Sequence, residues 1–138
     1  MCGNMMDKTS SVLKLLTIAV LTAGLIFSIS AIASYKNAKG TAVKYLQIIN
    51  YNKETYQELK AELYDVIAPE LQKLLFSKVE YEGANLPPIH YSVNSVRGSV
   101  IGCNHYVFQV NWTINYSQSI DSLIYIKDGV VYDAHRLE

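Results

Sequence analysis

Three histidines and one of the two cysteines are the side chains in this sequence whose type and spacing could support chemistry. They are His90, His105, His135 and Cys103. Cys103 and His105 stand two residues apart on an extended segment, so both side chains can point to the same face, and a histidine from another strand could complete a zinc site. The spacing matches no standard zinc motif, and polar residues on a sheet need no metal. We therefore predict no metal ligands.

A cysteine nucleophile paired with a histidine is the other chemistry that these residues allow. Such a pair needs a third group to orient the histidine and donors for the oxyanion, and the sequence shows no motif for either. The seven glycines are scattered and form no phosphate-binding loop. We predict no catalytic residue, no cofactor and no enzymatic activity.

The charges argue against a nucleic-acid partner. The 138 residues carry twelve basic and twelve acidic side chains, a formal net charge of zero. There is thus no basic excess to neutralise phosphates. Cys2 and Cys103 lie on opposite sides of a long apolar run, so we expect no internal disulfide. One small domain, residues 34–138, must then be stabilised by its own hydrophobic core.

The apolar run is the element that positions all of these residues. It begins at Leu15, ends at Ala33 and contains nineteen residues without a charge. At about 1.5 Å per residue it spans about 28 Å, close to the hydrocarbon core of a bilayer at ~30 Å. We predict a short tail (1–14), a transmembrane helix or signal anchor (15–33) and an extracytoplasmic α+β domain (34–138).

A second interpretation of the N-terminus stays open. Ala31 and Ala33, followed by Ser34, fit the small-x-small pattern of signal-peptide cleavage, so removal after Ala33 would release a soluble domain. The uncharged run is longer than a usual h-region, which favours retention.

The orientation in the membrane rests on the length of the tail. A fourteen-residue tail is normally left in the cytoplasm, whereas Lys36, Lys39 and Lys44 beyond the run count slightly against that topology. We predict a single-pass protein of the cell membrane whose C-terminal domain is outside the cytoplasm.

Helical periodicity follows the run. The pattern at residues 41–51 is that of a helix that can continue the membrane helix across Gly40, and Asn52 is a candidate N-cap for the next helix. That next segment has one apolar stripe at helical spacing: Tyr56, Leu59, Leu63, Val66 and Ile67. Pro69 then begins a short third helix, with the predicted buried residues Leu71, Leu74 and Leu75. We predict two or three helices packed on a sheet.

The period changes to two beyond a loop at 83–88, and Arg97-Gly98 and Gly102 predict turns or bulges. The clearest strand is predicted to begin at His105 and end at Ser117. Its six large residues share one face: Tyr106, Phe108, Val110, Trp112, Ile114 and Tyr116. Two glycosylation sequons, which begin at Asn111 and Asn115, fall within this strand, and we interpret them as its polar face. The fold class is therefore α+β, with a curved antiparallel sheet of about four strands.

Asp128-Gly129, between strands at 120–127 and 130–135, predicts a type I′ hairpin. In this register Tyr125 opposes Tyr132 and Ile126 opposes Val131, so both faces of the hairpin carry apolar side chains. The helices can cover one of these faces. The other is a candidate interaction face, although a curved sheet that wraps its own core explains the pattern equally well.

The order of elements resembles the α+β roll of the nuclear-transport-factor-2-like (cystatin-like) superfamily, over roughly residues 41–135. The likeness rests on the helices, the strand Tyr-Val-Phe-Gln-Val-Asn-Trp and the terminal hairpin. Catalytic members such as ketosteroid isomerases place an acid and a tyrosine inside the cone, and no such pair can be matched here. The superfamily also includes single-span assembly proteins of type IV secretion and conjugation machines, and this chain resembles their layout.

A second resemblance is to pseudopilins, which have an apolar N-terminal helix, a helical stalk and then a sheet. The glutamate expected just inside the apolar run is absent here. The leading hypothesis is a non-enzymatic, membrane-anchored scaffold or assembly component that binds secretion-machinery or other membrane proteins, or copies of itself. The alternatives are an exported ligand-binding or enzymatic roll and a pseudopilin-like subunit.

Overall fold

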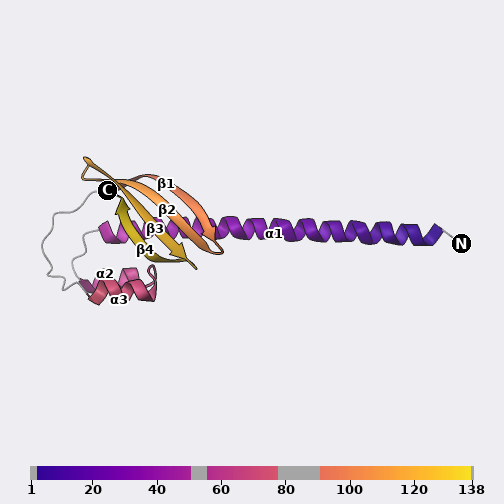
Figure 1. Ribbon diagram of the computed structural model, residues 1–138, viewed down its shortest axis with the longest axis horizontal. Coiled ribbons are helices and arrows are strands. Elements are labelled where there is room, and N and C mark those ends of the chain that lie inside the picture. Colours follow the sequence, from indigo (N-terminus) through magenta and orange to yellow (C-terminus); the bar gives the residue numbers. More distant parts are fainter. Residues whose placement is uncertain (1–2, 51–55, 78–90, 138) are drawn as a thin grey trace. The chain divides into compact units, whose positions relative to one another are not determined.

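The computed structural model describes residues 3–50, 56–77 and 91–137. Its elements are α1 (Gly3–Asn50), α2 (Tyr56–Tyr64), α3 (Pro69–Ser77), β1 (Tyr91–Gly102), β2 (His105–Ile114), β3 (Gln118–Lys127) and β4 (Val130–Leu137) (Figure 1). The predicted α+β class with an antiparallel sheet of four strands is confirmed. The chain divides into two compact units, Met1–Ala33 and Ser34–Glu138, and each is described by itself.

The first unit is the N-terminal part of α1 and carries the apolar run. Every residue from Ser11 to Ala33 is exposed. The hydroxyls within the run donate to the carbonyls four residues earlier at 2.6–3.0 Å; they belong to Thr17, Thr22, Ser28 and Ser30. The helix thus satisfies its own polar groups, as a hydrocarbon solvent would require. Among the described residues, one helical stretch, Ser11–Ile49, is long and apolar enough to cross a membrane.

The second unit is built on a simple meander, in which each strand pairs antiparallel with the next in the order β1-β2-β3-β4 (Figure 1). The β2–β3 pairing runs from His105–Lys127 to Ile114–Gln118 without interruption. β1 has two register shifts, between Val93 and Ser95 and between Val100 and Gly102. Such bulges increase the local bend and twist of a strand.

The core of this unit lies between one face of the sheet and the C-terminal part of α1. Alternate residues of β2 are buried, as the period of two predicts: Tyr106, Phe108, Val110 and Trp112. α1 contributes Ala38, Ala42, Tyr45, Leu46 and Ile48 to the same cluster. A helix and a sheet that bury their apolar faces together form a stable layer pair.

The segment between α2 and α3 pairs with the outer edge of β4. Ile67 forms an isolated parallel bridge with Val131. The amide of Ala68 donates to the carbonyl of Val131 at 2.7 Å, and the amide of Val131 donates to the carbonyl of Val66 at 2.8 Å. Leu63, Val66 and Ile67 of the predicted stripe are buried in the core.

Several local predictions are confirmed. Pro69 begins α3, and α1 continues across Gly40. Asp128 and Gly129 have φ angles of 50° and 87°, the left-handed conformation that a type I′ turn requires at both central residues. The prediction for Asn52 as an N-cap lies outside the described residues, as do the 83–88 loop and His90.

Three predictions are wrong. β2 ends at Ile114 rather than Ser117, because Asn115 and Tyr116 adopt φ angles of 47° and 62° and turn the chain. Tyr116 is therefore 87% exposed instead of buried, and the second sequon begins in this turn. Leu74, predicted to be buried, is 57% exposed. At Arg97-Gly98 the pairing with β2 continues without a turn or bulge.

Candidate interaction face

The sheet has a second face, opposite the core, which we call the outer face. It is formed by the residues that alternate with the buried ones, such as His105, Gln109 and Asn111 on β2 and Asp121 and Tyr125 on β3. All of these are half-buried or exposed. Side chains on this face are therefore open to solvent or to a partner.

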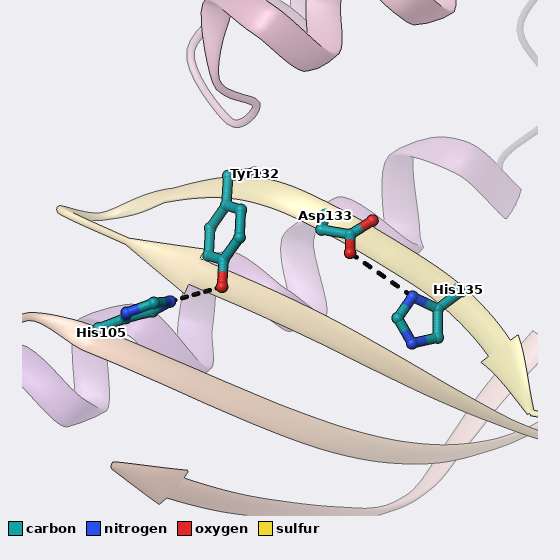
Figure 2. Close-up of polar contacts among 4 residues, drawn as sticks. All are labelled: His105, Tyr132, Asp133 and His135. Atoms are coloured by element: carbon teal, nitrogen blue, oxygen red, sulfur yellow. Dashed lines mark hydrogen bonds and ion pairs between the residues drawn. The ribbon is translucent and has the colours of Figure 1, made fainter. Parts of the chain in front are cut away.

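One half of the outer face carries a cluster of rings, which we call the aromatic–histidine cluster: His105, Tyr125, Tyr132 and His135. The ring centroids are 5.1 Å apart for His105 and Tyr132, 6.0 Å for Tyr125 and Tyr132, and 5.3 Å for Tyr125 and His135. The Nε2 atom of His105 is hydrogen-bonded to the hydroxyl of Tyr132 (Figure 2). The Nδ1 atom of His135 lies 3.7 Å from a carboxylate oxygen of Asp133 (Figure 2).

A bulge in β4 assembles this cluster. Ile126 pairs with Val131 as predicted, but Tyr125 pairs with Asp133 instead of Tyr132. Tyr132 is the extra residue of the bulged strand, and a bulge can re-aim a side chain in this way. The predicted opposition of the two tyrosines is wrong in register, although their rings are neighbours.

The four residues of the predicted interaction face thus lie on two different faces of the sheet. Ile126 and Val131 are completely buried against the core. Tyr125 and Tyr132 are half-buried on the outer face, where part of each ring is accessible. The accessible part of the prediction is therefore the tyrosine pair.

The other half of the outer face is polar and hollowed. A hollow of about 260 Å³ is lined by Ser95, Arg97, Gln109, Asn111 and Asp121. The basic Arg97 and the acidic Asp121 border the same space, so it offers both a hydrogen-bond donor and an acceptor of opposite charge.

Asn111 organises the floor of this hollow. Its Nδ2 donates to the carboxylate of Asp121 and to the hydroxyl of Ser119, both at 3.1 Å. Its Oδ1 accepts from the side-chain amide of Asn94 at 2.8 Å, and that amide also donates to the hydroxyl of Thr113 at 2.8 Å. A network that links three strands in this way fixes the orientation of its polar groups.

The surroundings of Tyr132 raise the pKa of its phenol. Burial raises the pKa of Tyr132 above its ordinary value of 10.0, and the negative charge of Asp133 and the neighbouring Tyr125 raise it further. The hydroxyl can donate to Nε2 of His105 or accept from it, depending on which ring nitrogen carries the proton. Burial, and then Asp133, also raise the pKa of Tyr45 on α1.

The residues that could support chemistry do not converge. Cys103 is exposed in the turn before β2, His105 is engaged by Tyr132, and His135 stands beside Asp133. Across residues 3–50, 56–77 and 91–137, no three His, Cys, Asp or Glu side chains are grouped to hold a metal ion. The Asn111 network and the hollow were not predicted; the paired register of β2 and β3 is the signal that would have brought Asn111 opposite Asp121.

Comparisons with known proteins find no relative. No family model, no curated protein and no solved structure matches the chain significantly.

Proposed function

We propose that this protein is a non-enzymatic assembly component anchored in the cell membrane, whose 34–138 domain binds another protein on the outer face of its sheet. The observation that carries the proposal is the accessible tyrosine pair, Tyr125 and Tyr132, in the aromatic–histidine cluster. Tyrosine is enriched at interfaces because its ring contributes apolar area while its hydroxyl keeps a polar partner.

The surroundings of the pair support a protein partner. Protein interfaces combine an aromatic centre with a polar rim that supplies hydrogen bonds. The aromatic–histidine cluster offers the first, and the hollow with Arg97, Gln109 and Asp121 offers the second on the same face. The histidines already have side-chain neighbours, and the rings pack against one another, so the face is ordered before a partner arrives.

Membrane anchoring is the second part of the proposal. The exposed apolar helix with internally satisfied hydroxyls supports it. In the proposed topology the domain lies outside the cytoplasm, as in the single-span components of secretion and conjugation machines that the chain resembles. N-terminal sequencing of the native protein separates the anchored form, which begins at Met1, from an exported domain, which begins at Ser34.

The test is co-purification of the full-length protein from membranes in mild detergent. Tyr125→Ala with Tyr132→Ala removes the accessible rings, and Tyr64→Ala is the matched control, because Tyr64 is 63% exposed on α2, away from the sheet. We expect a specific protein to co-purify with the wild type and with the control and to be lost from the double variant. Recovery of the wild type alone and as a monomer would overturn the proposal.

One observation favours a pseudopilin-like subunit as the second candidate. α1 is a single helix over Gly3–Asn50, and its buried C-terminal residues pack on an antiparallel meander. This subunit would assemble with copies of itself, so cross-linked ladders of this chain, without a second protein, would select that candidate.

A further inference from the structure

One end of the 34–138 domain gathers the start of its helix and two hairpin turns. Ser34 lines a small hollow together with Asn104 of the β1–β2 turn and with Asp128 and Gly129 of the β3–β4 turn. The amide of Asp128 donates to the carbonyl of Asn104 at 3.0 Å. These contacts bring both turns to the end of the domain at which its chain begins.

The apolar run lies directly before this end of the domain in the sequence. Ser34 directly follows Ala33, the last residue of the apolar run. With the run in the hydrocarbon core, Ser34 enters the headgroup region, which adds about 5–8 Å on each side of a bilayer. The three residues from Asn104 back to Ile101 can span at most about 10 Å, so this hairpin is within reach of the headgroups.

The part of the β1–β2 hairpin that is within reach of the headgroups carries apolar surface. Val100 is 65% exposed and Ile101 is 49% exposed, and they are followed by the exposed Cys103. We call residues 100–103 the hairpin tip. Moving two adjacent aliphatic side chains from water to the boundary between headgroups and acyl chains is favourable, because their apolar surface is removed from water.

The charges near this end suit anionic lipid. Lys36 and Lys39 are exposed in the first turns of the helix after Ser34, and Lys127 is exposed at the end of β3. These three lysines outnumber the exposed Asp128, which lines the same small hollow. Basic side chains close to a membrane surface are attracted by anionic headgroups over a distance of about one Debye length, roughly 10 Å.

We infer that the hairpin tip is a second membrane contact, in which Val100 and Ile101 enter the headgroup region of an anionic bilayer. This inference rests on the anchoring part of the proposed function. It assigns to the β1–β2 hairpin a lipid surface as its partner, while the proposed protein partner binds the outer face.

The test uses the full-length protein in liposomes of phosphatidylcholine, with or without phosphatidylglycerol. Cys2→Ser leaves Cys103 as the only thiol, and Cys103 is labelled with a polarity-sensitive fluorophore. The matched control carries Cys2→Ser, Cys103→Ser and Tyr116→Cys and is labelled at position 116, in the turn at the opposite end of β2. We expect a blue-shifted emission at position 103, with quenching by headgroup-proximal spin-labelled lipid, and neither effect at position 116.

Two further variants test the proposed causes. Val100→Ser with Ile101→Ser should abolish the quenching at position 103, and Lys36→Gln with Lys39→Gln should remove its dependence on phosphatidylglycerol. Circular dichroism of each variant verifies that it is folded. Equal emission and quenching at positions 103 and 116 would overturn the inference.

Flotation separates this failure from a failure of the anchor. If the protein floats with liposomes but the label at position 103 stays in water, the inference is wrong and the anchor stands. If the protein does not float at all, the anchor fails, and the inference fails with it.

Discussion

Gly98 is the position at which the packing of the domain makes its sharpest prediction. A Cβ atom added there would lie about 2.4 Å from Cε1 and 2.6 Å from Cδ1 of Phe108, and 2.5 Å from the hydroxyl oxygen of Tyr35. The phenol of Tyr35 is the end of a side chain that can shift. Phe108 is completely buried, so its ring can move only by displacing its neighbours in the core. Gly98→Ala must therefore displace β1 or the centre of the core.

The expected cost of Gly98→Ala is that of overpacking, about 1–3 kcal/mol of unfolding free energy. For a domain of this size that corresponds to a fall in Tm of about 4 to 20 °C. Gly40→Ala is the control, because a Cβ atom at Gly40 meets nothing within 4 Å and alanine favours a helix by up to about 1 kcal/mol. The assay is thermal unfolding of the full chain in detergent, with circular dichroism as the recorded signal.

A double variant tests the stated cause. Phe108→Leu removes the ring atoms that the new methyl group would meet, so Gly98→Ala should cost less in that background, with a coupling of about 0.5–3 kcal/mol. An unchanged Tm for Gly98→Ala, or strict additivity with Phe108→Leu, would refute the close packing of β1 over this ring.

Three other predictions follow from the same structure. Trp112→Phe should lower stability by about 1–3 kcal/mol in urea unfolding, because it leaves the buried hydroxyl of Ser122 without the indole donor that lies 2.9 Å away; Ser122→Ala in the same chain should recover part of this loss, and no recovery would contradict the explanation. The raised pKa values of Tyr45 and Tyr132 mean that the folded domain holds these protons more tightly than the unfolded chain does. This contribution to stability is complete below about pH 10 and is lost as the pH rises through the raised pKa values. In a titration followed by tyrosinate absorbance, both phenols should ionise above the ordinary tyrosine pKa, and Asp133→Asn should move both transitions to lower pH. In a microsomal translation system Asn115, exposed in its turn, should receive a glycan if the domain is translocated, whereas Asn111 in β2 should not; a mobility shift that survives Asn115→Gln would contradict this.

The elements could be predicted where local chemistry decides them. Pro69 can begin a helix but not continue one, and Asp128-Gly129 accepts the left-handed conformation, so α3 and the last hairpin follow from the residues themselves. Asn115-Tyr116 contains no glycine, and the alternation of polar and apolar residues runs through it. The end of β2 was therefore missed. Asn115 tolerates a left-handed φ, but an asparagine is also compatible with a strand, so its presence alone does not indicate a turn.

The candidate site depended on register, which the sequence does not specify as well. Periodicity was sufficient to separate the outer face from the core on β2. It could not locate the bulge at Tyr132. The extra residue is recognised only when β4 is paired with β3, because Val131 pairs with Ile126 and Asp133 pairs with Tyr125. The placement of Tyr125 beside His135, and of Asn111 opposite Asp121, is tertiary information of this kind.

The bridge between Ile67 and Val131 has a consequence for self-association. It occupies part of the free backbone of β4 with a segment of the same chain, so a neighbouring molecule cannot add a full-length strand at that margin. Of the two margins of the described sheet, β1 is the other, and its two register shifts interrupt the regular row of amides that a docking strand would need. Both margins of the described sheet are thus poor templates for a strand from another copy, which disfavours edge-to-edge association.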